Sequence, residues 1–286
     1  MDWTIFKLIS WTEGYFKEQG VDSPRLTAEI LLGFCLDIKR LDLYLQHDRP
    51  LEASELAKFK ALIKRRCQGE PVAYITGEKG FFESEFQVAP GVLIPRPDTE
   101  VLLETAMAFL GKKDSRANVL EMGVGSGALI VSLAQACPDH SYFGSDISPM
   151  ALETARKNAR RLLETPIEFF QGSWLEALSP DVDFDLILSN PPYIPSHDIE
   201  DLARDIREYE PRLALDGGED GLDCYRLILE SAASHLAPGG ILAMEMGYDQ
   251  KPGMSALVDS RSGFLPPRFI RDLAGHHRVV VLEKRN

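Results

Sequence analysis

A glycine-rich segment that follows an apolar strand is the feature that most constrains how this chain can fold. Residues 121–130 read EMGVGSGALI and come directly after the apolar residues 119–120. Gly123, Gly125 and Gly127 allow the backbone to turn sharply and to approach a ligand closely at the start of the next helix. This order of strand, glycine loop and helix is typical of α/β domains that bind an adenosine-bearing cofactor.

From about residue 95 onward, apolar strands alternate with helices. Strand candidates lie at residues 119–120, 142–143, 167–170, 186–188, 241–244 and 279–282. One helix is predicted to begin at Ser148-Pro149, where the serine can cap and the proline fits the first turn, and to run to about residue 163. The alternation predicts a doubly wound, mostly parallel sheet, whose ligands bind beyond the carboxyl ends of the strands.

The first 70 or so residues follow a helical pattern instead. A helix is predicted to begin at Ser23-Pro24, with a capping hydroxyl and a proline in the first turn. A later amphipathic helix is predicted to end near Gly69 and Pro71, and its apolar face carries Leu56, Phe59, Leu62 and Ile63. Between Gly77 and Pro95, aromatic residues among glycines predict a short β-hairpin. We therefore expect a helical domain over residues 1–76, a hairpin linker over 77–95 and an α/β domain over 96–286.

The composition is that of a globular protein with room for one large and one small domain. The chain has 286 residues, of which 44% are hydrophobic and 26% charged. No apolar run approaches the roughly 18 residues of a membrane span, and the N-terminus lacks a signal-peptide pattern. The scattered cysteines predict free thiols rather than disulfides or a metal site; they are Cys35, Cys67, Cys137 and Cys224. We expect a cytoplasmic protein that binds no membrane and no metal.

The distribution of charge argues against nucleic acid as a partner. The formal net charge is −13, and residues 1–77 contain equal numbers of basic and acidic residues, so the excess falls in residues 78–286. Contacts between basic side chains and phosphates supply most of the non-specific affinity for DNA and RNA. A strongly acidic region such as residues 78–286 cannot provide these contacts. We therefore expect no direct binding of nucleic acid.

Asp146 lies at the end of the strand that follows the glycine loop, 23 residues after Gly123. A carboxylate at this place can accept hydrogen bonds from both hydroxyls of a ribose. However, Gly123-x-Gly125-x-x-Ala128 also satisfies the nicotinamide fingerprint. The loop and Asp146 therefore leave S-adenosylmethionine and NAD both open as cofactors.

The motif Asn190-Pro191-Pro192-Tyr193 follows the fourth strand and favours methyl transfer. Its prolines cannot continue a strand, and they hold Asn190 at the carboxyl edge of the sheet. The side-chain oxygen of Asn190 and the carbonyl of Pro191 can accept the two hydrogens of an NH2 group, while Tyr193 can offer a ring face to the substrate and to a sulfonium. An amide nitrogen shares its lone pair with the carbonyl, so two acceptors on its hydrogens help it to attack a methyl group. The motif does not distinguish an amide from the exocyclic amine of a nucleic-acid base.

Over essentially its full length the chain resembles the release factor glutamine methyltransferase family (PrmC/HemK). The stretches that carry the resemblance include VDSPRLTAEILL, EPVAYITGEKGFFESEFQV, VLIPRPDTE, EMGVGSGALIVSLA, SNPPYIP, YEPRLALDGGEDGLDCYR and DLAGHHRV. The resemblance implies a small helical domain that recognises the substrate, a β-hairpin and a Rossmann-like class I methyltransferase domain. It also implies transfer of a methyl group from S-adenosylmethionine to N5 of the glutamine in the Gly-Gly-Gln motif of peptide chain release factors.

The resemblance also implies the site residues. The cofactor would be bound by Gly123, Val124, Gly125, Ser126, Gly127, Asp146, Trp174 and Asn190, with Asp146 at the ribose and Trp174 beside the adenine. The substrate glutamine would be bound by Asn190, Pro191, Pro192 and Tyr193, with Asn190, Pro191 and Tyr193 as the catalytic residues. Ser173 departs from the family, because many relatives carry an acidic residue there, so its contact with adenine stays open.

Three alternatives remain beside this interpretation. A sister family methylates a glutamine of a ribosomal protein, but it differs at the segment that reads Arg96-Pro97-Asp98-Thr99-Glu100 here. A nucleic-acid amine methyltransferase would use the same planar NH2 group, and a nicotinamide dehydrogenase or a non-catalytic nucleotide-binding module would use the same loop. The sequence leaves the individual roles within residues 96–100 open, including a purely structural part in anchoring the hairpin.

Overall fold

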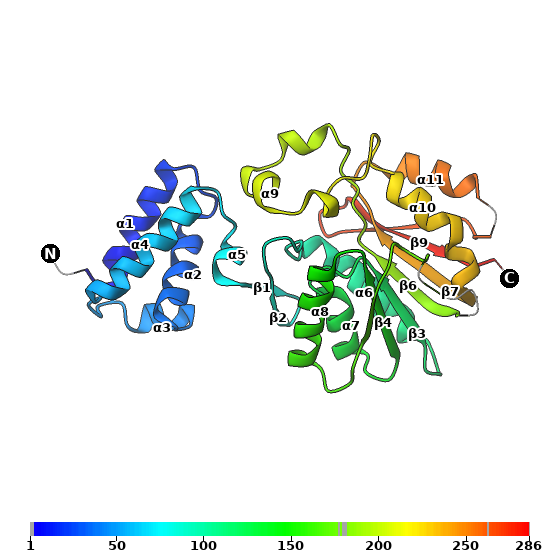
Figure 1. Cartoon of the computed structure of the whole chain (residues 1–286), viewed down its shortest axis with the longest axis horizontal. Helices are drawn as coiled ribbons and strands as arrows, with labels where there is room; N and C mark the ends of the chain where they lie inside the picture. Colours follow the sequence, from blue (N-terminus) through cyan, green and yellow to red (C-terminus); the bar gives the residue numbers. More distant parts are fainter. Residues whose placement is uncertain (1–2, 177, 179–181, 262, 286) are drawn as a thin grey trace. The chain divides into compact units, whose positions relative to one another are not determined.

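The computed structural model describes residues 3–176, 178, 182–261 and 263–285. The chain divides into two compact units, the first made of Met1–Glu78 and Ala203–Tyr209, the second of Lys79–Leu202 and Glu210–Asn286. The domain boundaries expected at residues 76 and 95 stay predictions. The expected hairpin region contains a two-stranded sheet of β1 (Glu78–Phe81) and β2 (Ser84–Gln87) (Figure 1).

The first unit consists of helices. They are α1 (Ile5–Glu18), α2 (Pro24–Leu36), α3 (Arg40–Leu45), α4 (Ala53–Cys67), α5 (Val72–Thr76) and, from much later in the chain, α9 (Arg204–Tyr209). Helix α2 packs against α1, α3, α4 and α5 around a core that includes Phe16, Leu31 and Phe59. Helix α9 joins this unit through hydrogen bonds of its own, since the hydroxyl of Tyr209 donates to the carbonyl of Gln68 at 3.0 Å.

One local prediction in this unit is wrong. Helix α2 begins at Pro24 as expected, but Ser23 does not cap it through its side chain. The backbone of Ser23 is left-handed, with φ of 45°, whereas a capping residue normally has an extended backbone that directs its oxygen at the first turn. At the other predicted start, Ser148 has an extended backbone, and its hydroxyl accepts from the backbone N–H of Ala151.

The second unit is built on a seven-stranded sheet in the order β5-β4-β3-β6-β7-β9-β8. Its strands are β3 (Asn118–Met122), β4 (Ser141–Asp146), β5 (Glu168–Gln171), β6 (Phe184–Ser189), β7 (Leu236–Glu245), β8 (Arg268–Arg271) and β9 (His277–Glu283). The first five strands in this order are parallel to one another, while β9 is antiparallel to β7 and to β8. The expected doubly wound, mostly parallel sheet is confirmed, and all six predicted strands are present.

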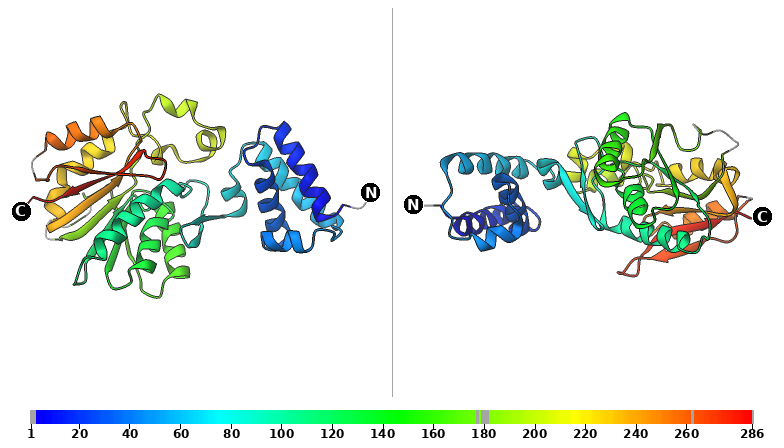
Figure 2. Two further views of the ribbon diagram at one scale, coloured as in Figure 1. Left: turned by 180° about the vertical axis from the view of Figure 1, so that it is seen from behind. Right: turned by 90° about the horizontal axis from the view of Figure 1, so that it is seen from below.

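Helices cover both faces of the sheet, as the views in Figures 1 and 2 show. The first face is covered by α6 (Glu100–Leu110), α7 (Ala128–Ala136) and α8 (Pro149–Leu162), the second by α10 (Asp223–Ser231) and α11 (Lys251–Asp259). In β6, Leu186 and Leu188 join the first hydrophobic cluster, and Ile187 between them joins the second. Both faces of β6 are therefore buried, which explains its continuous apolar run Leu186–Leu188. Short 3₁₀ helices complete the chain: η1 (Pro97–Thr99), η2 (Asp198–Asp201), η3 (Arg212–Ala214) and η4 (Ala232–His235).

The strand order creates a switch point between β3 and β6. From β3 the chain builds outward through β4 to β5, then returns to place β6 and β7 on the other side of β3. The loops that follow β3 and β6 consequently diverge to opposite faces and leave a crevice at the carboxyl ends of these strands. The glycine loop follows β3 and the Asn-Pro-Pro-Tyr motif follows β6, so the fold brings the two sequence motifs to one edge.

Candidate active site

A cavity of about 270 Å³ lies in the second unit at this edge of the sheet. It brings together residues that follow four different strands, and six of the predicted site residues line it: Gly123, Gly125, Asp146, Trp174, Asn190 and Pro192. The segment after the hairpin adds Gly91, Val92 and Leu93, and η3 adds Leu213 and Ala214. The cavity therefore combines the glycine loop, the carboxylate of β4 and the asparagine of β6 in one place.

The glycine loop is shaped differently at its two ends. At Gly125, where φ is +53°, an added Cβ would meet no atom within 4 Å, so the backbone faces open space beside the cavity. At Gly127, where φ is +79°, an added Cβ would lie 3.0 Å from the Cβ of Ala155, so this residue packs closely on α8. Both values of φ belong to the left-handed region that favours glycine. The loop thus exposes backbone to a ligand at one end and holds α7 against α8 at the other.

Val124 and Ser126 lie beneath the loop rather than in the cavity lining. Val124 is buried in a small cluster with Leu152 and Ala155 of α8. The carbonyl of Ser126 accepts from the side chain of Asn158 at 2.8 Å. These two predicted cofactor residues therefore support the loop from below, and any contact with a cofactor would be made through their backbone.

Asp146 is oriented by two backbone N–H groups. Its Oδ2 accepts from the N–H of Gly125 at 2.9 Å, and its Oδ1 accepts from the N–H of Ser148 at 2.8 Å. Burial raises the pKa of Asp146 above its ordinary value, while these hydrogen bonds act in the opposite direction. Each oxygen keeps a further lone pair. The carboxylate is thus fixed at the cavity wall and still able to accept hydrogen bonds from ligand hydroxyls.

Trp174 and Ser173 form another part of the cavity wall. Trp174 has φ of +49°, a left-handed conformation that is unusual for a bulky residue and often occurs at functional sites. Its ring also packs partly on the hydrophobic cluster of the second sheet face. The conformation places an aromatic side chain at the cavity wall, and its contact with adenine stays a prediction.

Asn190 lies in the cavity wall, and its amide group is held by a buried polar chain. The Nδ2 group of Asn190 donates to the hydroxyl of Thr99 at 3.0 Å, and that hydroxyl donates to Oε2 of Glu245 at 2.6 Å. The hydroxyl of Tyr193 donates to the other oxygen of Glu245 at 3.2 Å. The side-chain oxygen of Asn190 takes no part in this chain, so it is the end of the amide available to a ligand.

The two prolines and Tyr193 occupy different positions around the cavity. Pro192 lines it, Pro191 is buried, and Tyr193 packs partly against the second hydrophobic cluster. Burial and the neighbouring Glu245 carboxylate raise the pKa of the Tyr193 hydroxyl. The ring of Tyr193 is not part of the cavity lining, so the contact between its face and the substrate stays a prediction.

The Asn-Pro-Pro-Tyr loop is clamped by the segment that reads LALDGGEDGL. The N–H of Ile194 donates to the carbonyl of Leu215, and the carbonyl of Ile194 accepts from the N–H of Gly217. An added Cβ at Gly221 would lie 2.4 Å from the carbonyl oxygen of Tyr193, so no side chain fits there. This close contact of two backbones explains the glycine at position 221.

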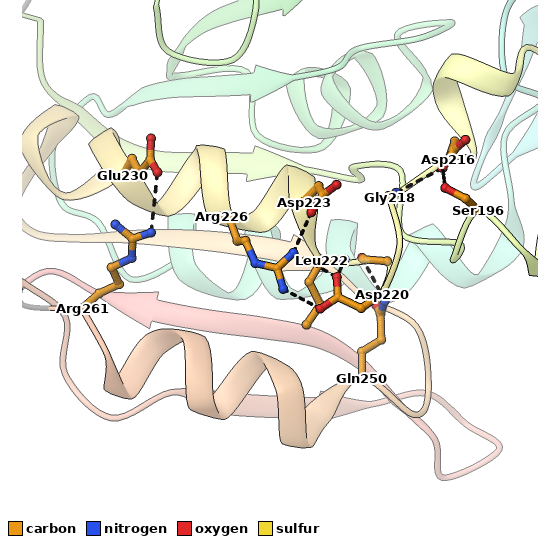
Figure 3. A network of polar contacts seen from close by, with 11 residues as sticks. Ser196, Asp216, Gly218, Asp220, Leu222, Asp223, Arg226, Glu230, Gln250 and Arg261 are labelled. Atoms are coloured by element: carbon orange, nitrogen blue, oxygen red, sulfur yellow. Dashed lines mark hydrogen bonds and ion pairs between the residues drawn. The ribbon is translucent and has the colours of Figure 1, made fainter.

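Ion pairs and hydrogen bonds hold that clamping segment in place (Figure 3). Asp216 accepts from the hydroxyl of Ser196 at 2.5 Å and from the N–H of Gly218 at 3.1 Å. Arg226 of α10 pairs with Asp220 and Asp223. The segment is therefore tied both to the residues after Tyr193 and to a helix that packs on the sheet.

The side chain of Gln250 connects three loops. Its Nε2 group donates to the carbonyls of Tyr193 at 2.9 Å and Gly221 at 3.0 Å. Its Oε1 accepts from the N–H of Gly247 at 2.9 Å. A single side chain thus joins the Asn-Pro-Pro-Tyr motif, the clamping segment and the loop that follows β7.

Each polar residue of the segment 96–100 has a definite partner. Arg96 pairs with Glu210 at 2.5 Å, Asp98 pairs with Arg278 at 3.0 Å, and Thr99 belongs to the chain that holds Asn190. Glu100 accepts from the N–H of Phe82, in the turn of the hairpin, at 3.1 Å. The segment therefore anchors the hairpin through Glu100 and supports the site through Thr99.

Glu245 and Gln250 were not identified from the sequence. Both belong to the run EMGYDQ at the end of β7, and Glu245 ends a strand as Asp146 does. A polar residue that directly follows a buried apolar strand is the signal that marked Asp146 and Asn190, and it applies to Glu245 as well. The geometry adds that Glu245 is 0% exposed and that its carboxylate is linked to the site through its hydrogen bonds with Thr99 and Tyr193.

Within the described ranges, no group of three or more histidine, cysteine or acidic residues is arranged to hold a metal ion. The same part of the chain contains no helix that is long and apolar enough to cross a membrane. His276 makes a ring contact with Tyr248, and Nε2 of His277 lies 3.4 Å from Nζ of Lys251.

Comparison with protein families gives two matches. Residues 7–77 match the family described as PrmC N-terminal domain, and residues 119–209 match one described as methyltransferase domain. A release factor glutamine methyltransferase of Geobacter sulfurreducens is 46% identical over 278 residues, which cover 97% of this chain and 96% of that protein. The release factor glutamine methyltransferase of Moorella thermoacetica is 40% identical, and the match covers 93% of each chain. That of Rhodopirellula baltica is 35% identical, and the match covers 99% of this chain and 97% of that protein.

Solved structures show the same fold at low sequence identity. A 16S rRNA methyltransferase of T. thermophilus has a TM-score of 0.54 at 22% identity, and the match covers 73% of this chain and 50% of that one. A methyltransferase of Pyrococcus furiosus has a TM-score of 0.52 at 19% identity, and the match covers 78% of this chain and 98% of that one. These similarities concern the Rossmann-like methyltransferase fold alone.

Proposed function

The chain belongs to the release factor glutamine methyltransferase family. From this membership and the geometry of the site, we propose that it transfers a methyl group from S-adenosylmethionine to a glutamine side chain. The proposed target is the glutamine of the Gly-Gly-Gln motif in peptide chain release factors. The single observation that carries the proposal is the orientation of Asn190. Its NH2 group donates to Thr99 at 3.0 Å, which leaves its oxygen as an acceptor at the cavity wall. An acceptor at this place suits a substrate that presents an NH2 group.

The residues of the cavity fit the proposed cofactor. Asp146 keeps free lone pairs for the ribose hydroxyls, Gly125 leaves space for a close approach of the backbone, and Trp174 offers an aromatic surface for adenine. When bound, S-adenosylmethionine supplies an electrophilic methyl group on a positively charged sulfur. Residues 123–127 would hold its amino-acid part and Asp146 its ribose.

The protein's own contribution to the reaction is positioning and electrostatics. The oxygen of Asn190 and the carbonyl of Pro191 would accept the two hydrogens of the glutamine NH2 group. These hydrogen bonds strengthen as the nitrogen becomes positive, because acceptors aimed at a developing positive charge stabilise the transition state more than the ground state. The pairing also fixes the plane of the amide, so that its nitrogen faces the methyl group. No strong base is required before the transfer.

The first unit has a separate role in this proposal, which is recognition of the protein substrate. Residues 7–77 match a domain described by the family's own name, and this region is not acidic overall, unlike the rest of the chain. A cytoplasmic location belongs to the same proposal. It is supported by four free cysteines, which are typical of a reducing compartment.

The experiment that tests the proposed function offers the protein several substrates at once. The full-length protein is incubated with S-adenosylmethionine and purified release factors, ribosomal proteins or DNA, and each product is mapped by mass spectrometry. We expect one added methyl group on the glutamine of the release factor's Gly-Gly-Gln motif. An unmodified release factor together with a methylated ribosomal protein or base would contradict the proposal.

A further inference from the structure

Glu245 is a fully buried carboxylate with no place in the proposed reaction. It ends β7, it is 0% exposed, and it does not line the cavity. The two hydroxyls that donate to it belong to Thr99 and Tyr193. Burying a carboxylate is unfavourable unless its partners compensate, so a buried carboxylate beside an active site is a candidate for a functional role.

The hydroxyl of Thr99 links the protonation state of Glu245 to the orientation of the Asn190 amide. A hydroxyl has one proton to donate. When Thr99 donates that proton to the carboxylate at 2.6 Å, its oxygen can only accept from Asn190, at 3.0 Å. The Asn190 amide must then turn its NH2 group toward Thr99, and its oxygen is left for the substrate.

We propose that Glu245 is a positioning residue of the active site, which acts through the Thr99 hydroxyl to hold the Asn190 amide in the orientation that presents an acceptor to the substrate NH2 group. This inference rests on the proposed function, since it assigns a cause to the orientation that the reaction needs. The site then depends on the direction of three consecutive hydrogen bonds: from Thr99 to Glu245, from Asn190 to Thr99, and from the substrate to Asn190.

Protonation of Glu245 would reverse this chain. A protonated carboxyl can donate to the oxygen of Thr99, and the Thr99 hydroxyl is then free to donate to the oxygen of Asn190. The amide turns over and directs its NH2 group at the substrate position. The NH2 group of Asn190 would then face the NH2 group of the substrate, which keeps only the carbonyl of Pro191 as an acceptor, so the protonated form transfers the methyl group more slowly.

The groups around Glu245 place this change near neutral pH. Burial raises the pKa of Glu245 to about 7, against the hydrogen bonds from Thr99 and Tyr193 and the positive charge of Arg278 on β9. Asp98 of η1 adds a negative charge that raises the pKa further. From α10, the hydroxyl of Tyr225 donates to the backbone carbonyl of Glu245 at 2.8 Å. The carboxylate form of Glu245 therefore increases as the pH rises through about 7.

The first test is the hydroxyl itself. Thr99→Val keeps the shape of the side chain and removes the relay, whereas Thr99→Ser keeps the hydroxyl. We expect Thr99→Val to lower the single-turnover rate of release factor methylation about tenfold, the equivalent of one net hydrogen bond, and Thr99→Ser to restore most of it. Calorimetry should give the same Kd for S-adenosylmethionine in both variants, which separates this effect from loss of the fold.

The second test is the pH profile of the single-turnover rate at saturating cofactor. In the wild type we expect the rate to rise with pH through about 7. Glu245→Gln should have a lower rate at pH 8 and should lack this rise. Asp98→Asn removes a negative charge that raises the pKa of Glu245, so it should move the rise to lower pH. Any titration of the cofactor's own amino group occurs in every variant and cancels in the comparison.

The outcomes of these tests separate the two proposals. A wild-type protein that leaves the release factor glutamine unmodified contradicts the proposed function. An active wild type whose rate is matched by Thr99→Val, or whose pH profile is shared by Glu245→Gln, contradicts the positioning role while the function stands. A rise that disappears in Glu245→Gln and shifts in Asp98→Asn supports both.

Discussion

Asn190 and Thr99 are 91 positions apart in the chain, and the Nδ2 group of Asn190 lies 3.0 Å from the Thr99 hydroxyl that accepts its hydrogen bond. Asn190 follows β6, whereas Thr99 ends the 3₁₀ helix η1 in the segment after the hairpin. The contact joins the two most distinctive motifs of the sequence. It also distinguishes the two ends of the asparagine amide, which a catalytic acceptor requires.

The acceptor role of Asn190 predicts different effects of two substitutions. Asn190→Ala removes the oxygen and should cost about 2–4 kcal/mol of transition-state stabilisation. Asn190→Asp keeps an oxygen in place and adds negative charge near a nitrogen that becomes positive, so it should retain clearly more activity than the alanine variant. Single-turnover methylation at saturating cofactor measures both. Equal rates would show that the oxygen of Asn190 is not the important group.

The orientation of Asp146 predicts its effect on cofactor binding. Asp146→Ala should weaken binding of S-adenosylmethionine by about 1.5–3 kcal/mol, the value typical of hydrogen bonds to a charged group. Asp146→Asn keeps one acceptor oxygen and should have an intermediate effect. Calorimetry on folded variants provides the measurement, and an unchanged affinity in Asp146→Ala would remove the residue from the ribose site.

The hydrogen bonds that the Gln250 side chain makes with three loops predict a loss of stability when it is replaced. Gln250→Ala leaves the carbonyls of Tyr193 and Gly221 without this donor and should lower the free energy of unfolding by about 1 kcal/mol, since the site is half-buried. Gln250→Glu is the matched control, because it has the same size and keeps the acceptor for Gly247 while losing both donated bonds. Denaturant unfolding should rank the wild type above both variants. A stability for Gln250→Glu equal to that of the wild type would mean that the donated bonds contribute nothing.

How much of this site the sequence predicts depends on how local each contact is. The glycine loop, Asp146 and the Asn-Pro-Pro-Tyr motif were placed correctly at strand ends, because strand patterns and turn residues are local features. Strand β8 was missed, because it is a four-residue edge strand that is only half-buried, so its RFIR sequence lacks an apolar run. Glu245 carries the same strand-end signal as Asp146 and was overlooked. The contacts that Glu245 and Gln250 make with the loop after β6 depend on the position of β7 next to β6, which no local pattern specifies.

The buried carboxylate of Glu245 predicts a stability that depends on pH. Its pKa is raised from 4.5 to about 7 in the folded protein, so the native state favours the protonated form. The corresponding stabilisation is complete below pH 4.5 and is lost as the pH rises through 7, by about 3 kcal/mol. Glu245→Gln does not titrate. Its free energy of unfolding relative to the wild type should therefore increase by most of this amount between pH 5 and pH 8, while its methylation rate at pH 8 stays below that of the wild type.

That comparison is made by urea unfolding of the two proteins at several pH values. A difference between them that stays constant with pH would show that Glu245 is ionised throughout this range. The control is Glu230→Gln at an exposed ion pair with Arg261, which should leave the pH dependence unchanged.

The central claim is that the methyl group is transferred to an amide nitrogen, and the chemical fate of a labelled methyl group tests it most directly. The protein is incubated with a release factor and S-adenosylmethionine that carries an isotope in its methyl group, and the purified release factor is hydrolysed in acid. Hydrolysis of an N-methylated glutamine side chain cleaves the amide bond, so the label should appear as methylamine beside unlabelled glutamic acid. Label released as methanol, or retained on an amino acid, would contradict the claim.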